Sequence, residues 1–245
     1  MTSEISPAYA AEGKGKLPPM ADMESQFTKF SAKLDRDLDD LSMGGDFDDA
    51  AGNLRRDANV LLLLAIAIGR SDESGTLKPA APALLREAKA LLEAADAKTA
   101  AEAVKAIQNI VAAPEASEGE VDWENTVQLA PLMAKVVPSL TTEIKRLSKN
   151  EKTLLRSRNA KNVAGNAAAL AVVAAGSRLS VAETNAPDQE ALWKECCDEF
   201  CVLSLNVNEA AHAMGNGGAF DDYTVALQEL EETCNTCHEK FSVVQ

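Results

Sequence analysis

Apolar residues recur at the spacing of an α-helix along nearly the whole chain. From Asp22 onward they lie three and four positions apart, and no segment alternates convincingly at the two-residue period of a strand. Gly and Pro, 13 and 9 of the 245 residues, rarely interrupt the pattern, which favours an almost wholly helical protein. We therefore predict an all-α fold with eight helices, at residues 22–43, 47–69, 80–95, 98–112, 124–149, 151–178, 188–214 and 220–243.

Turn signals divide these helices into two sets of four. The stretch from Pro114 to Gly119 (PEASEG) is the strongest boundary, and the other breaks are short. Short loops favour antiparallel neighbours, so each set is expected to form an antiparallel four-helix bundle. The predicted organisation is a flexible N-terminal segment at 1–21, a first bundle at 22–113, a linker at 114–119 and a second bundle at 120–245.

The two predicted bundles resemble copies of one unit. Their opening helices carry apolar stripes at identical intervals, and the helices that follow share three matches after one inserted residue. The stripes are Phe27, Phe30, Leu34, Leu38 and Leu41 against Met133, Val136, Leu140, Ile144 and Leu147; the matches are Asn59 with Asn166, Leu63 with Leu170, and Gly69 with Gly176. The repeat predicts two tandem bundles that could pack together as an internal pseudo-dimer.

The acidic charge excludes some classes of partner. The chain carries 38 Asp and Glu against 24 Lys and Arg, a formal charge of −14, which would repel nucleic acid and anionic membranes. The longest apolar run, residues 58–69, is too short to cross a bilayer and suits a buried core helix. We expect no nucleic-acid partner and no membrane span. The charge favours solubility and would also steer the protein toward a basic partner.

Thiol and imidazole chemistry is confined to the C-terminal part, because all five Cys and both His follow residue 195. The strongest motif is CNTCH, residues 234–238, the pattern by which two thiols add to haem vinyl groups and the adjacent imidazole binds iron. On a helix, Cys234, Cys237 and His238 share one face. The motif predicts one covalently attached haem c, with His238 as the proximal iron ligand.

Two other interpretations of the cysteines compete with haem. A thioredoxin-type CxxC needs a strand–helix setting, which this chain lacks. Cys196, Cys197 and Cys201 could complete a zinc site with Cys234 and Cys237, giving a zinc-stabilised helical interaction protein. We favour haem for the motif and small apolar core positions for the three additional thiols.

A CxxCH on the final helix of a four-helix bundle resembles the cytochrome c′ family and its low-spin relatives. Residues 187–193 (PDQEALW) resemble the opening of that family's third helix, and 234–241 (CNTCHEKF) its terminal signature. The resemblance covers 120–245 and reaches 22–112 only through the repeat. It implies a haem protein, not an enzyme, that passes single electrons to a redox partner in the periplasm or binds small gases such as NO and CO. A periplasmic location is predicted although no signal peptide is evident.

The resemblance also implies a candidate sixth iron ligand. In the low-spin relatives a Met from the first helix of the bundle supplies it, and Met133 fits that place. Met133 could equally fill the core, and an open sixth site would favour gas binding. The rivals His212 and Met214 are expected to be exposed at a helix end. Pro138 should kink the helix that carries Met133.

Two further expectations concern residues away from the motif. Tyr223, 11 positions before Cys234, could bind a haem propionate or cover the bundle end with its hydroxyl in water. The first bundle should be haem-free, because its last helix, about 99–111, has neither Cys nor His and Phe27 occupies the place of Met133. We expect that bundle to serve as a built-in packing partner for the second.

Overall fold

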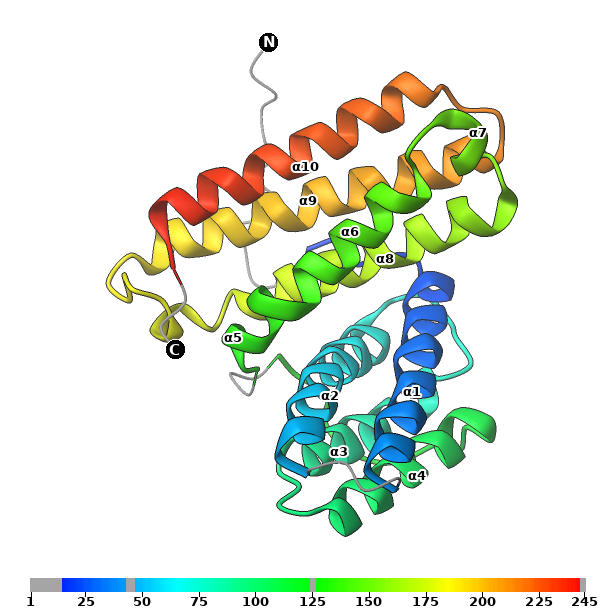
Figure 1. Ribbon diagram of the computed structural model, residues 1–245, viewed down its shortest axis with the longest axis vertical. Helices are drawn as coiled ribbons and strands as arrows, with labels where there is room; N and C mark the ends of the chain where they lie inside the picture. Colours follow the sequence, from blue (N-terminus) through cyan, green and yellow to red (C-terminus); the bar gives the residue numbers. More distant parts are fainter. Residues whose placement is uncertain (1–14, 43–46, 124–126, 243–245) are drawn as a thin grey trace.

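The computed structural model describes residues 15–42, 47–123 and 127–242 and shows an all-α protein (Figure 1). The first bundle contains α1 (Met20–Ser42), α2 (Phe47–Arg70), α3 (Ala81–Leu92) and α4 (Ala97–Ala112), with a short 3-10 turn, η2 (Lys78–Ala80), before α3. Each helix packs on the next, and α4 returns to α1, so the four helices form a closed ring around their apolar faces.

The second bundle contains the remaining helices. The long ones are α6 (Val137–Leu147), α8 (Ser157–Ser177), α9 (Glu190–Gly215) and α10 (Phe220–Lys240), which run side by side in Figure 1. The short elements are α5 (Leu129–Pro131), η3 (Leu132–Val136), α7 (Glu151–Leu154) and η4 (Val181–Glu183). Packing is closest between α6 and α8, α8 and α9, and α9 and α10. The all-α prediction is confirmed.

The two bundles share one apolar core. Helix α8 packs against both α1 and α2, and η3 also contacts α2. Residues 60–68 of α2 and 163–174 of α8 are buried without interruption, because each helix is covered on all sides. The expected buried helix at 58–69 is therefore α2. Within the described residues, no helix combines the length and apolar character needed to cross a membrane.

Polar side chains also join the bundles. The amide of Asn208 on α9 donates to the carboxylate of Asp22 on α1 (Nδ2–Oδ2 2.8 Å), and the same oxygen lies 2.7 Å from Nε2 of His212. Lys29 on α1 donates to Asn166 on α8 (Nζ–Oδ1 2.7 Å). These contacts fix α1 across the second bundle.

The prediction of one helix at 124–149 differs from the structure. Residues 124–126 lie outside the described residues, helix begins at Leu129, and a five-residue π-helix, Leu132–Val136, ends two residues before Pro138. The amide of Val137 donates to the carbonyl of Leu132, five residues back. Because Pro138 has no N–H for the carbonyl of Ala134, regular helical bonding cannot continue through this point. The π-helix thus lies next to Pro138, the residue at which we expected a kink.

Two boundaries also differ from the sequence prediction. The expected helix at 151–178 is interrupted after α7, where Arg156 has an extended backbone (φ −65°, ψ 117°). Residues 15–21, assigned to a flexible segment, are packed: Pro18 is buried and Lys16 pairs with Glu209. The remainder of that segment, 1–14, lies outside the described residues.

Candidate functional site

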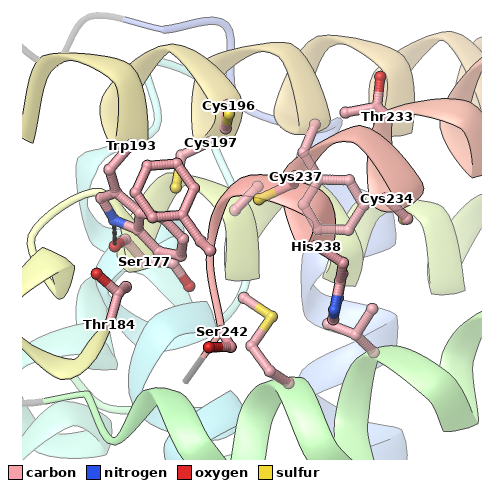
Figure 2. A pocket seen from close by; sticks show the side chains of 15 residues that line it. Ser177, Thr184, Trp193, Cys196, Cys197, Thr233, Cys234, Cys237, His238 and Ser242 are labelled. Atoms are coloured by element: carbon pink, nitrogen blue, oxygen red, sulfur yellow. Dashed lines mark hydrogen bonds between the residues drawn. The ribbon is translucent and has the colours of Figure 1, made fainter. Parts of the chain in front are cut away.

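Helix α10 presents the CxxCH residues to an apolar cavity. Cys234, Cys237 and His238 all line it, because positions i, i+3 and i+4 share a helix face (Figure 2). Cys234 and Cys237 are half-buried, whereas His238 is exposed at the cavity edge. Two thiols and one imidazole therefore meet at a single site, as the motif predicts.

Aromatic side chains form one wall of this cavity. The indole N–H of Trp193 on α9 donates to the carbonyl of Ser177 at the end of α8 (2.8 Å). The ring of Trp193 meets that of Phe241 edge to face, with centroids 5.2 Å apart. Both residues are buried, so the wall is rigid and apolar.

Two hydrogen bonds hold the chain after α10 beside the site. The amide of Asn185 donates to the carbonyl of Ser242 (2.9 Å), and the amide of Ser242 donates to Oδ1 of Asn185 (2.8 Å). This pair of bonds holds the segment that carries Phe241 against the α8–α9 connection. The C-terminal end of α10 is thereby fixed to the rest of the site.

Met133 lies at the same cavity. It is half-buried within η3 and belongs to the small apolar cluster that contains Trp193 and Phe241. The structure thus brings all four residues predicted for haem binding, Met133, Cys234, Cys237 and His238, to one place.

The rival ligands lie elsewhere. Met214 is 1% exposed and packs in the main core, so the expectation of an exposed residue at the helix end was wrong for it. His212 contacts Asp22 instead of the cavity. Tyr223 is also fully buried, at the other end of α10, so it neither reaches the site nor places its hydroxyl in water; burial raises its pKa to about 12. Cys201 is buried in the main core.

Cys196 and Cys197, predicted as small apolar core residues and, in the zinc alternative, as ligands beside Cys234 and Cys237, line the site from α9 across from Cys237 (Figure 2). The Cys237 thiol hydrogen-bonds to that of Cys196. The signal was present in the sequence: Trp193, Cys196, Cys197 and Phe200 lie at i, i+3, i+4 and i+7 on one helix face. Both thiols are also buried in the small apolar cluster with Trp193, as expected of core positions.

The environment keeps the thiols protonated. Burial raises the pKa of Cys196, Cys197 and Cys234, and burial together with the nearby Cys196 raises the pKa of Cys237 to about 12. Within residues 15–42, 47–123 and 127–242, no three His, Cys, Asp or Glu side chains come together in a way that could hold a metal ion.

The residues fit a haem in chemistry, although the cavity is tight. Its volume is about 60 Å³, below the roughly 300–1,000 Å³ of typical small-molecule sites. Helices α6 and α10 stand at the two ends of the packed series α6–α8–α9–α10. An exposed ion pair joins them, Lys145 with Glu231 (Nζ–Oε1 3.1 Å). The contact between α6 and α10 is therefore the least extensive one between neighbouring helices of the second bundle. The side chains of these two helices would have to separate to admit the haem macrocycle.

Comparison of the chain with protein-family models, curated proteins and solved structures finds no match. Functional inference therefore depends on the motif and on the geometry of its surroundings.

Proposed function

We propose that the chain is a monohaem c-type cytochrome that transfers single electrons. The observation that supports this most directly is the meeting of Cys234, Cys237 and His238 with Met133 at one apolar cavity. Haem, when bound, supplies an iron that cycles between ferric and ferrous states. The resemblance of the C-terminal helix to the cytochrome c′ family supports the same proposal.

Each residue of the site has a definite role in this proposal. The sulfurs of Cys234 and Cys237 form the thioether links, which fix the cofactor to α10. The imidazole of His238 would bind the iron, and the thioether of Met133 is the candidate for a second protein ligand. Trp193 and Phe241 exclude water, and a more apolar surrounding changes the reduction potential of the iron.

The net charge and the haem-attachment motif suggest a type of partner and a cellular location. The charge of −14 would attract a basic redox partner and speed encounter at low ionic strength. Attachment of haem to CxxCH takes place in exported proteins of the resembling family. We therefore propose a periplasmic location, which fractionation of native cells would test directly; recovery of the protein in the cytoplasmic fraction would contradict it.

Haem attachment is tested by maturing the full chain in a host that makes c-type cytochromes. The protein should keep its haem after denaturation and acid–acetone extraction. Cys234→Ala with Cys237→Ala should abolish covalent attachment, whereas Cys201→Ala should retain it, because Cys201 lies outside the cavity. A colourless product would refute the proposal. About one zinc per chain without iron would in addition support the zinc-stabilised alternative.

A further inference from the structure

A second cavity lies where the two bundles meet. Its volume is about 350 Å³, within the range of small-molecule sites. Residues of α1, α2, η3 and α6 line it, and none of them is used in the proposed haem chemistry. The charged lining residues are Lys33, Arg36, Asp37, Arg56, Asp57 and Lys135.

Two of these charges neutralise each other. The guanidinium of Arg56 holds the carboxylate of Asp57 with two bonds, Nε–Oδ1 2.7 Å and Nη2–Oδ2 2.9 Å, and donates a third to Asn53 (3.1 Å). Asp57 is fully buried, so this pair supports the wall of the cavity.

The remaining lining charges leave an excess of positive charge. Lys33, Arg36 and Lys135 stand against Asp37, which gives three positive charges minus one negative charge, or +2. Arg36 and Lys135 are exposed, and within the described part of the chain neither forms an ion pair. A local excess of +2 is unexpected in a chain whose net charge is −14.

One of these three cations, Lys33, is partly buried. The Nζ of Lys33 lies 4.2 Å above the ring of Phe30, and burial lowers the pKa of Lys33 despite the nearby Asp57. The neighbouring Lys29 has a lowered pKa for the same reason, with Lys33 adding repulsion. Partly desolvated like charges repel, and a bound anion would relieve that repulsion.

We propose that this cavity binds a small oxyanion carrying at least two negative charges, either a phosphate group or a polycarboxylate. Arg36 offers a planar fork of donors that matches either oxyanion, and Lys33 on α1 and Lys135 in η3 add point charges. The Ser139 hydroxyl at the rim is a further donor. The volume is within the range of sites that hold a small molecule.

Binding would also couple the two halves of the chain. Lys33 and Arg36 belong to the first bundle, whereas Lys135 belongs to η3 of the second. Because the anion contacts both, it should stabilise the folded protein in proportion to its concentration.

Calorimetric titration of the full chain at constant ionic strength tests the proposal, with inorganic phosphate and citrate as probes and acetate as the monovalent control. Saturable binding of one anion per chain is expected, with a rise in the unfolding midpoint. Tighter binding of phosphate would identify a phosphate-bearing ligand, and tighter binding of citrate a polycarboxylate.

Variants that replace a cationic side chain by a neutral one distinguish binding at this cavity from non-specific electrostatic attraction of the anion. Arg36→Gln and Lys135→Gln should each weaken binding about tenfold or more, since each removes a charged contact. Lys105→Gln, an exposed lysine on α4, removes the same charge elsewhere and should leave affinity unchanged. All three changes lie on the surface, and circular dichroism would verify their fold. The proposal is wrong if neither anion binds saturably, or if all three variants bind as the parent does or lose affinity equally.

Discussion

Gly176 on α8 lies directly against the side chain of Leu63 on α2. A Cβ atom at position 176 would overlap the methyl groups of Leu63, which is itself fully buried. The absence of a side chain therefore lets α8 approach α2 closely enough to join the two bundles. The same two residues belong to the internal sequence matches, Leu63 with Leu170 and Gly69 with Gly176.

Replacing this glycine should weaken the whole protein. We expect Gly176→Ala to lower the free energy of unfolding by about 1–3 kcal/mol, because the fully buried Leu63 side chain would have to shift within a packed core. Gly52→Ala is the matched control: its Cβ would meet only Lys135 Nζ at 3.9 Å, so better helix propensity should stabilise by about 0.5–1 kcal/mol. Urea denaturation measures both, and equal effects would contradict close packing at Gly176.

The buried polar contact between α1 and α9 should also carry stability. Asp22→Ala removes the acceptor of Asn208, which is fully buried, and the partner of His212. The Asn208 amide keeps its bond to the carbonyl of Ala164 (2.8 Å) but loses the one to the carboxylate, a loss that costs about 1–3 kcal/mol. The exposed Asp188→Ala should change unfolding by less than about 0.5 kcal/mol. An unfolding midpoint for Asp22→Ala equal to that of the control would show that this contact is dispensable.

Tyr223 should make stability depend on pH in the alkaline range. Its folded pKa is raised from 10.0 to about 12, so the neutral phenol is favoured by the fold. That contribution is fully present below pH 10 and is lost as the pH rises toward 12, with a size on the order of 2 kcal/mol. The parent should therefore lose stability relative to Tyr223→Phe over this window. A difference that stays constant from pH 9 to 12 would exclude the shift.

The spin state of the haem-loaded protein should report on Met133. If its sulfur binds iron, the ferric spectrum is low-spin with a Met-to-iron charge-transfer band, and Met133→Leu becomes high-spin. Met214→Leu, a change of similar volume in the main core, should keep the parent spectrum. A parent that is already high-spin and shifts with NO or CO would instead support the gas-binding alternative.

Periodicity was sufficient to place most of the helices. The predicted helices at 47–69 and 98–112 end within one residue of α2 and α4, because turn and capping residues mark their ends. At the start of α4, for example, the carboxylate of Asp96 accepts from the amide of Thr99 (2.8 Å). The strict spacing of CxxCH likewise allowed the common face of Cys234, Cys237 and His238 to be derived from helix geometry.

Tertiary contacts decided what periodicity could not. Before Pro138, the bond from Val137 to the carbonyl of Leu132 replaces regular helical bonding. The missing N–H of proline predicts an interruption of the helix but does not predict that it takes the form of a π-helix. Burial of Met214 and the position of Cys197 beside Cys237 depend on which faces of α9 meet α8 and α10. A single helix of mixed composition does not reveal those faces.

The unbroken burial of α2 and α8 has a consequence for how the chain can be divided. Cutting it between the bundles would expose, on each piece, the apolar flank that the other now covers, including Leu63 on one side and the groove at Gly176 on the other. Exposed apolar surfaces of this kind promote association in water. The two pieces, mixed in equal amounts, should therefore recombine with each other as a complementary pair, and each alone should self-associate or precipitate.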